Sequence, residues 1–185
     1  MAVHTIRIGD LQRHLPVVPV SDDVSIAFLK LYGDTELLEV ATAALADQLT
    51  DDADVIVGPE SGGILLAHLL AQRTKRPCVI ARKKVRPNMT APLRVPVRTI
   101  GTAGEQELVL GEDDAAVIDG RRVALIDEVV SSGGTLQALL TLVGAAGGEV
   151  VQTLAVATEG ERRPSVTSLV HLPVFTREPG DGAAG

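Results

Sequence analysis

The stretch Arg122–Leu140, RVALIDEVVSSGGTLQALL, decides the fold, because an apolar run in it leads into two acids, a loop of small residues and a helical pattern. Val123–Ile126 holds four consecutive apolar residues, which is typical of a parallel strand covered on both faces. Asp127 and Glu128 follow at its carboxyl end. A helix that starts near Thr135 would direct its positive end at the small-residue loop. The stretch therefore predicts a site for a sugar phosphate, with the phosphate in the loop and the carboxylates facing hydroxyls or a metal.

The remaining chain repeats this alternation of strands and helices. Helices are predicted at Asp34–Leu49, Ile64–Arg73 and Leu136–Ala146, and further strands at Asp54–Val57, Cys78–Ala81, Leu108–Leu110 and Glu149–Thr158. The pattern predicts an α/β fold with a doubly wound, mainly parallel sheet. A length of 185 residues fits one domain over residues 1–185.

One segment breaks the rhythm. Arg86–Gly104 contains three prolines, two glycines and scattered basic residues, without a helical pattern. It is expected to form a long loop or a β-arm, serving either as a lid over a site or as an exposed hairpin. The tail, residues 180–185, is expected to be disordered.

Composition excludes several classes of function. The chain has two Phe, one Tyr and no Trp, which disfavours modules that stack nucleic-acid bases on aromatic rings. Its net charge of -7 also disfavours a nucleic-acid partner. Yet Ser61–Gly104 has no acid and nine of the 17 Lys and Arg, so a compact anion such as pyrophosphate would be attracted there, unless this stretch is a solvated surface or a subunit contact.

Cysteine and hydropathy bear on the compartment. Cys78 is the single cysteine and lies in an apolar setting, so a core thiol in a reducing cytoplasm is expected. The first ten residues lack the apolar run of a signal peptide, and no apolar run approaches the roughly 20 residues of a membrane span. The expectation is a cytoplasmic protein without membrane association.

The Arg122–Leu140 stretch resembles the phosphoribosyl-pyrophosphate signature of type I phosphoribosyltransferases, with strand, acid pair, loop and helix in the required order. The resemblance lies nearest the adenine and xanthine branches and covers roughly Asp34–Glu159. It implies a hood segment at about residues 1–33, a flexible loop at about 86–104, Mg²⁺ as cofactor and a homodimer. It also implies a role in purine salvage.

The resemblance assigns roles to several residues. Asp127 and Glu128 would hold the ribose hydroxyls as catalytic residues. The 5′-phosphate loop would comprise Ser131, Ser132, Gly133, Gly134 and Thr135, and pyrophosphate would meet Glu60, Ser61, Gly62, Arg82, Lys83 and Lys84. In the family, the residue at Lys83 can reach the neighbouring subunit's pyrophosphate. Phe28 would stack on the base, or else belong to the core, and Tyr32 is a weaker candidate for stacking. No residue is assigned as a direct metal ligand.

The chain departs from the family pattern at four places. Gly62 stands where adenine enzymes usually have Arg, and Ser131 stands where the hypoxanthine-guanine and orotate enzymes have Asp. Thr102 and Ala103 align with a Glu-Tyr pair of the adenine enzymes. Glu105 or Glu107 could substitute for the missing Glu, so the proton acceptor is left open.

The expected function is transfer of the phosphoribosyl group of phosphoribosyl pyrophosphate to a purine base, with release of pyrophosphate. Adenine is the first choice of base, and xanthine or hypoxanthine the second. The alternative is a non-catalytic regulatory protein that binds phosphoribosyl pyrophosphate or a nucleotide. The sequence has no triphosphatase phosphate loop or dinucleotide fingerprint, and its four His are scattered.

Overall fold

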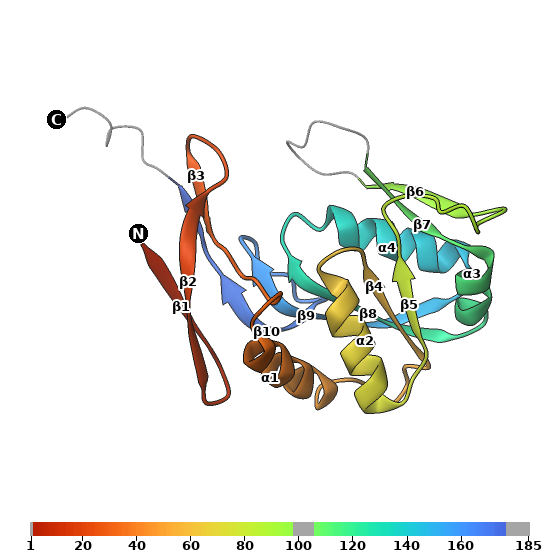
Figure 1. Ribbon diagram of the computed structural model, residues 1–185, viewed down its shortest axis with the longest axis horizontal. Coiled ribbons are helices and arrows are strands. Elements are labelled where there is room, and N and C mark those ends of the chain that lie inside the picture. The colour runs from red at the N-terminus through yellow and green to blue at the C-terminus, as the bar shows by residue number, and fades with distance from the viewer. Residues whose placement is uncertain (1, 98–105, 177–185) are drawn as a thin grey trace.

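The computed structural model describes residues 2–97 and 106–176 and centres on a five-stranded parallel sheet (Figure 1). Its strands are β4 (Val55–Pro59), β5 (Cys78–Ala81), β8 (Arg122–Val130), β9 (Glu149–Glu159) and β10 (Thr167–Leu172). They lie in the order β10-β9-β8-β4-β5, and each neighbouring pair is parallel. The predicted α/β class with a mainly parallel sheet is confirmed.

The order of the strands creates a switch point between β4 and β8. From β4 the chain moves outward to β5, and it later returns to the other side of β4 and proceeds through β8, β9 and β10. Connections therefore leave the carboxyl ends of β4 and β8 in opposite directions. In open parallel sheets this leaves a crevice where ligands bind.

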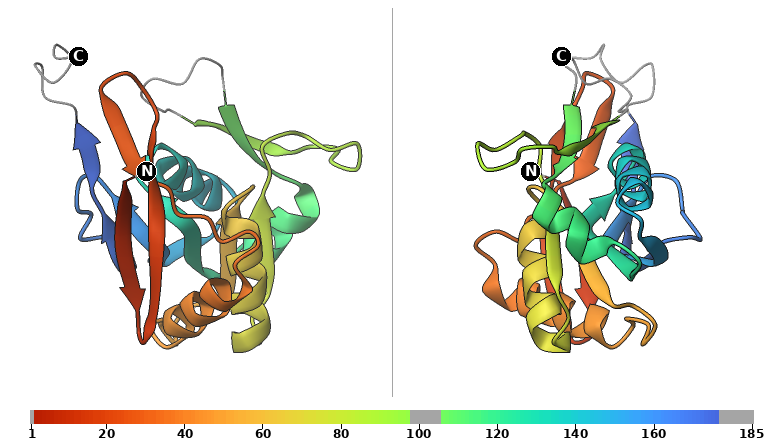
Figure 2. Two further views of the ribbon diagram at one scale, coloured as in Figure 1. Left: turned by 60° about the vertical axis from the view of Figure 1, so that its left-hand side comes forward. Right: turned by 90° about the vertical axis from the view of Figure 1, so that its right-hand side faces the viewer.

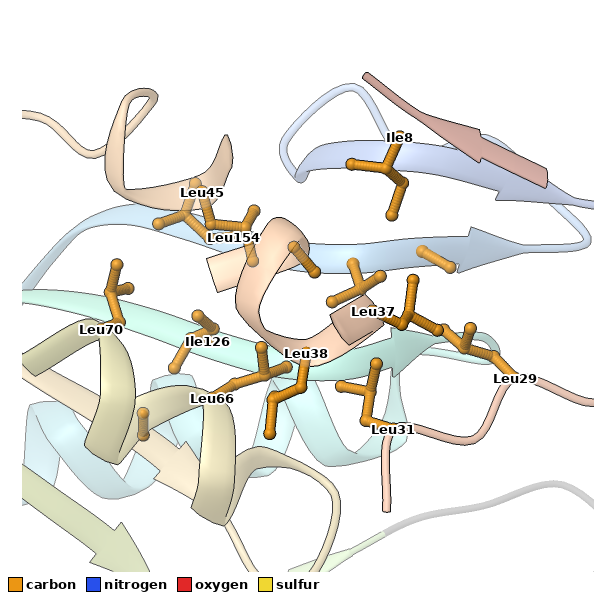
Figure 3. Packing of buried hydrophobic residues seen from close by; sticks show 14 of the residues in the cluster. Ile8, Leu29, Leu31, Leu37, Leu38, Leu45, Leu66, Leu70, Ile126 and Leu154 are labelled. Carbon is orange, nitrogen blue, oxygen red and sulfur yellow. The ribbon is translucent and has the colours of Figure 1, made fainter. Parts of the chain in front are cut away.

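Helices cover both faces of this sheet. On one face, α1 (Thr35–Ala46) and α2 (Gly63–Thr74) share a core with alternate residues of β4 and β8. Leu38 of α1 and Leu66 of α2 pack beside Ile126 there (Figure 3). On the other face, α3 (Glu112–Ile118) and α4 (Gly134–Ala145) pack against residues such as Leu125. The apolar run in β8 is thus buried from two sides, as its sequence predicts.

A second, antiparallel sheet stands next to β10. It contains β1 (Val3–Ile8), β2 (Leu11–Pro19), β3 (Val24–Ala27) and β11 (Val174–Thr176) in that order. Figures 1 and 2 show it on the side of the molecule away from β5. Arg13 of β2 pairs with Asp34, which also caps α1. The first three strands occupy the segment expected to be a hood.

The β-arm predicted as one form of Arg86–Gly104 is present in its described part. β6 (Leu93–Val97) pairs antiparallel with β7 (Gln106–Leu110), and residues 98–104 of the predicted flexible loop lie outside the described residues. The prediction that Leu108–Leu110 continues the strands of the central sheet is wrong. These residues are apolar because β7 packs against α4 and the edge of β5.

Two other boundaries differ from expectation. β8 runs on to Val130, so the two acids are its sixth and seventh residues and do not follow its end. Helix α3 was not predicted, because Glu112–Ile118 is short and opens with three acids.

The predicted disordered tail, residues 180–185, lies outside the described residues. Within the described part of the chain, no helix is long and apolar enough to cross a membrane.

Candidate active site

The carboxyl end of β8 projects beyond its neighbour β4. Pairing of β4 with β8 stops at Val57 and Leu125, whereas pairing of β8 with β9 continues to Val130 and Thr158. One side of the projecting segment therefore faces the crevice. The turn that follows β4 lies there, since a Cβ atom on Gly62 would be 2.9 Å from Glu128 Oε2 and 3.5 Å from Asp127 Oδ1. The structure brings the acid pair and this turn together.

Asp127 and Glu128 face different parts of the molecule. Successive residues of a strand point to opposite faces. Glu128 lies on the face of α1 and α2, where its Oε1 atom accepts the backbone N–H of Leu31 at 2.9 Å. Asp127 lies on the face of α4 and accepts the N–H of Glu128 at 2.7 Å through Oδ1. One acid is therefore bound to the hood segment, and the other is directed towards the arm.

Burial controls the charge of these two acids. Desolvation raises the pKa of Asp127 to about 7, and the Glu128 carboxylate adds to the increase while Lys83 opposes it. Desolvation also raises the pKa of Glu128. A cationic ligand or hydroxyl donors beside a buried carboxylate would stabilise its charged form and lower its pKa. The environment favours a ligand that supplies such partners.

The loop after β8 is built to receive an anion. Gly133 adopts φ +83°, a left-handed conformation that glycine accepts readily, and α4 begins at Gly134. No side chain caps the first turn of α4, in contrast to α1, where Asp34 accepts the N–H of Leu37 at 3.0 Å. The free N–H groups of α4 and the helix dipole can therefore bind a phosphate.

The turn after β4 presents a second uncapped helix start. It runs from Pro59 to Gly63, includes a cis peptide bond between Glu60 and Ser61, and leads into α2 without a side-chain cap. Because a Cβ atom on Gly62 would lie only 2.9 Å from Glu128 Oε2 and 3.2 Å from Glu128 Cβ, an Arg at this place would require Glu128 to move. The absence of the family's Arg is thus coupled to the position of the acid.

Glu60 does not point its carboxylate at the crevice as a free negative charge. It accepts the N–H of Lys83 at 2.8 Å and lies 3.3 Å from an Arg86 nitrogen and 3.8 Å from an Arg82 nitrogen. The Lys83 hydrogen bond and these cations lower the pKa of Glu60. Glu60 therefore fixes the cationic segment, a role that the sequence did not specify. Lys84 is exposed and lines neither the cavity beside Asp127 nor the cavity beside Ser132.

Two cavities adjoin these loops. A cavity of about 170 Å³ is lined by Pro59, Glu60, Ser61, Gly62, Lys83, Val97, Gln106, Glu107, Leu108, Asp127 and Thr135. A larger one, about 570 Å³, is lined by Val95, Pro96, Ser132, Gly133, Gly134, Gln137, Ala138, Thr141 and Arg163. The smaller cavity unites one member of the Asp127–Glu128 pair, the turn after β4, Lys83 and the end of the loop. Lys83 borders the cavity of its own chain.

The hood segment approaches the same place through Tyr32. Its hydroxyl donates a hydrogen bond to the carbonyl of Ser61. Desolvation raises the pKa of Tyr32, and the negative charges of Glu128 and Asp127 raise it further. Phe28 is 47% exposed, so its alternative assignment to the core is wrong. The structure thus brings Tyr32, the weaker candidate from sequence, into direct contact with the predicted pyrophosphate turn.

Two residues at the site carry no role from sequence. Arg163, in the turn between β9 and β10, donates hydrogen bonds to the carbonyls of Ser131 and Ser132. Its signal was its place just beyond the carboxyl end of a core strand, where ligands of parallel sheets bind. Arg86 contacts Glu60 and lies in the basic Ser61–Gly104 stretch.

Glu107, left as a possible proton acceptor, lines the smaller cavity and forms two 2.9 Å hydrogen bonds with Arg94. Glu105, the other candidate, lies outside the described residues.

The acid pair fits Mg²⁺ only in company with a ligand. Among the residues that the structure describes, no group of three or more His, Cys, Asp or Glu side chains could hold a metal. Mg²⁺ is commonly bound by one or two carboxylates together with substrate phosphates and water. Asp127 and Glu128, with their raised pKa values, could supply those carboxylates.

Comparisons with known proteins agree on one family. A model described as the phosphoribosyl transferase domain matches residues 30–171. The adenine phosphoribosyltransferase of Thermotoga petrophila is 31% identical over 151 residues, which cover 77% of this chain and 83% of that protein. The hypoxanthine/guanine phosphoribosyltransferase of Methanothermus fervidus is also 31% identical, over 83% of this chain and 75% of that protein.

A solved structure shows the same fold. The crystal structure of adenine phosphoribosyltransferase from Thermoanaerobacter pseudethanolicus superposes with a TM-score of 0.69 at 24% identity. The match covers 85% of this chain and 95% of that one. The fold of this chain is therefore that of the matched structure over most of both chains.

Proposed function

Because the chain belongs to the phosphoribosyl transferase family, we propose that it is an enzyme that transfers the phosphoribosyl group of phosphoribosyl pyrophosphate to a purine base and releases pyrophosphate. One observation carries this proposal. The acid Asp127, the turn Glu60–Gly62, Lys83 and Thr135 border one cavity at the switch point of the sheet. This cavity suits the sugar and the pyrophosphate, and the larger cavity, lined by Ser132, Gly133 and Gly134, suits the 5′-phosphate.

Each part of the site has a distinct task in this reaction. Ser131, Ser132, Gly133, Gly134 and Thr135 bind the 5′-phosphate through backbone N–H groups and the start of α4. Asp127 and Glu128 grip the ribose hydroxyls. As pyrophosphate leaves, the sugar acquires positive charge, and these two carboxylates stabilise it without having to move.

The pyrophosphate is assigned to the cationic side of the cavity. Lys83 borders the cavity directly, and the amides of Ser61 and Gly62 lie at the uncapped start of α2. Arg82 lies 3.8 Å from Glu60, and neither Arg82 nor Lys84 lines this cavity. Lys83 takes the place of the missing Arg as the main positive charge on the leaving group.

Mg²⁺ is the proposed cofactor, and Asp127 and Glu128 are the residues that would hold it together with the substrate. When bound, the ion neutralises charge on the leaving pyrophosphate. The carboxylates themselves are kept in place by the N–H groups of Leu31 and Glu128. Their orientation is therefore fixed before any ligand arrives.

Adenine is the proposed base, with hypoxanthine or xanthine second. Support comes from relatives named adenine phosphoribosyltransferase, although relatives named hypoxanthine/guanine phosphoribosyltransferase match equally well. Tyr32 contacts the turn after β4, and Phe28 is exposed in the same hood segment, so each offers a ring that can stack on a purine. Glu107 is the proposed proton acceptor on the base.

We further propose a homodimer that acts in the cytoplasm, where the free thiol of Cys78 stays reduced.

A regulatory protein that binds the sugar phosphate without turnover is the second candidate. It is favoured by the absence of an Arg at the position of Gly62, because the missing Arg weakens binding of the leaving group.

The test is pyrophosphate release from phosphoribosyl pyrophosphate and Mg²⁺ with adenine, hypoxanthine, guanine, xanthine, orotate or uracil. Turnover with a purine and loss of turnover in Asp127→Ala support the enzyme. Binding of phosphoribosyl pyrophosphate without turnover on any base supports the regulator.

A further inference from the structure

Arg163 forms a two-point clamp on the loop that follows β8. Its Nε atom donates to the carbonyl of Ser131 at 3.0 Å, and its Nη2 atom donates to the carbonyl of Ser132 at 2.7 Å. The Arg163 backbone is itself fixed, because its carbonyl accepts the N–H of Val166 at 3.0 Å. One rigid guanidinium thus joins two consecutive peptide groups from a turn more than 30 residues away in sequence.

The clamp sets the direction of two N–H groups. In a planar trans peptide the carbonyl and the following N–H point in opposite directions. When Arg163 binds the carbonyls of Ser131 and Ser132, the N–H groups of Ser132 and Gly133 must point away from the guanidinium. They precede the uncapped first turn of α4, so they add to the N–H groups available for an anion.

Gly133 makes this close approach possible. A Cβ atom there would lie 3.0 Å from Arg163 Cζ and 3.1 Å from Nη1, so the guanidinium rests directly against the loop backbone. No carboxylate among residues 2–97 and 106–176 lies within ion-pair distance of Arg163. Its positive charge is therefore not neutralised in the described part of the chain and favours an anion at the loop.

We infer that Arg163 is a positioning residue that holds the Ser131–Thr135 loop in the form that binds a sugar monophosphate. The inference rests on the proposed function, because it assigns the monophosphate to this loop. Arg163 acts through the loop carbonyls, whereas the backbone N–H groups contact the phosphate. It should therefore affect affinity for the monophosphate end of the substrate and leave the pyrophosphate end unaffected.

The experiment measures calorimetric binding of ribose 5-phosphate and, separately, of pyrophosphate with Mg²⁺. Arg163→Met removes both donors, and Arg163→Lys keeps the charge but cannot reproduce the planar two-point contact. Arg162→Met is the matched control, because Arg162 is the exposed neighbour. We expect about tenfold weaker ribose 5-phosphate binding in Arg163→Met, at least about threefold weaker binding in Arg163→Lys, and no change in the control. Pyrophosphate binding should stay within about twofold in all variants.

Kinetics give a second readout. The KM for phosphoribosyl pyrophosphate should rise with the loss of binding, while kcat changes less than about twofold, because the loop contact is the same in ground and transition states. If Arg163→Met does not fold, Arg163→Lys decides. Unchanged ribose 5-phosphate affinity in the Met variant, or full affinity in the Lys variant, would overturn the inference. Failure of the unaltered protein to bind ribose 5-phosphate or phosphoribosyl pyrophosphate would instead overturn the proposed function.

Discussion

Two neighbouring acids near the end of β8 make different contacts because a strand directs them to opposite faces. Glu128 is tied to the hood through Leu31, and Asp127 borders the cavity beside Lys83. A single pair of adjacent residues thereby joins the N-terminal segment, the arm and the switch point of the sheet. The environment of Asp127 also leads to a testable effect of pH.

Replacement of Asp127 by Asn should stabilise the protein more at pH 8 than at pH 5. Burial raises the folded-state pKa of Asp127 to about 7, whereas the unfolded value is near 3.9. The folded state thus holds the proton more tightly, and this contribution to stability is full below about pH 4 and is lost as pH rises through about 7. Because Asp127 is partly accessible to solvent, we expect an extra gain of about 1–2 kcal/mol at pH 8. Urea unfolding without divalent cations measures it, and an equal gain at both pH values would contradict the assignment.

Glu107 should act on the base, and its removal should lower kcat. Glu107→Gln is expected to reduce kcat with adenine about 100-fold and to leave the KM for phosphoribosyl pyrophosphate within about threefold. Arg94→Gln is the control, because it breaks the same ion pair and keeps the carboxylate. Steady-state kinetics distinguish the two roles. If both variants lose activity equally, Glu107 only stabilises the arm.

The residues that the structure brings together at the crevice were predictable where they follow an apolar run in sequence. Asp127, Ser131 and Lys83 stand just beyond apolar runs, and such positions meet at one edge of a parallel sheet. Arg163 was not predictable as a partner of the loop, because its contacts span more than 30 residues. The contact of Tyr32 with Ser61 depends on how the hood packs, which no local pattern encodes.

At the scale of elements, the apolar runs located most of the central sheet and its helices. β5 has the predicted bounds, and α2 and α4 differ from prediction by one or two residues at each end. β7 was placed in the wrong sheet, because packing against α4 gives the same apolar pattern as a central strand. Strands of the hood alternate exposed and buried residues, and their pairing is set by tertiary contacts.

The hood should be coupled to the pyrophosphate turn through one hydroxyl. Tyr32→Phe removes the hydrogen bond to the Ser61 carbonyl, which contributes about 1 kcal/mol to stability. We expect a decrease of about 2–4 °C in Tm and faster hydrogen exchange in residues 28–34. Differential scanning calorimetry and exchange mass spectrometry measure these changes. Unchanged exchange in this segment would show that the hydroxyl does not secure the hood.

At the scale of the whole molecule, some of the basic residues of the Ser61–Gly104 stretch lie at the crevice. Lys83 borders the cavity, while Arg82 and Arg86 are held by Glu60. Because the rest of the chain carries an excess of acidic residues, a compact anion is attracted mainly to this basic region. Lys83 can serve the site of its own chain, which bears on how a homodimer would work.

A mixed dimer should discriminate between the two possible roles of Lys83. In the family the residue at this position can reach the neighbouring subunit, whereas here Lys83 borders its own cavity beside Asp127. If it acts within its own chain, a mixed dimer of Lys83→Ala and Asp127→Ala subunits has two defective sites and stays inactive. Activity assays on reconstituted dimers provide the measurement. Recovery of about one active site per dimer would show that Lys83 acts across the interface.

The most direct test of the account is a crystal structure with phosphoribosyl pyrophosphate and Mg²⁺. We predict the 5′-phosphate at Ser131–Thr135, the ribose hydroxyls at Asp127 and Glu128, and the pyrophosphate beside Ser61, Gly62 and Lys83. Electron density for the ligand in this orientation would establish the site. Density in any other cavity, or a sugar that does not contact the two acids, would contradict the central claim.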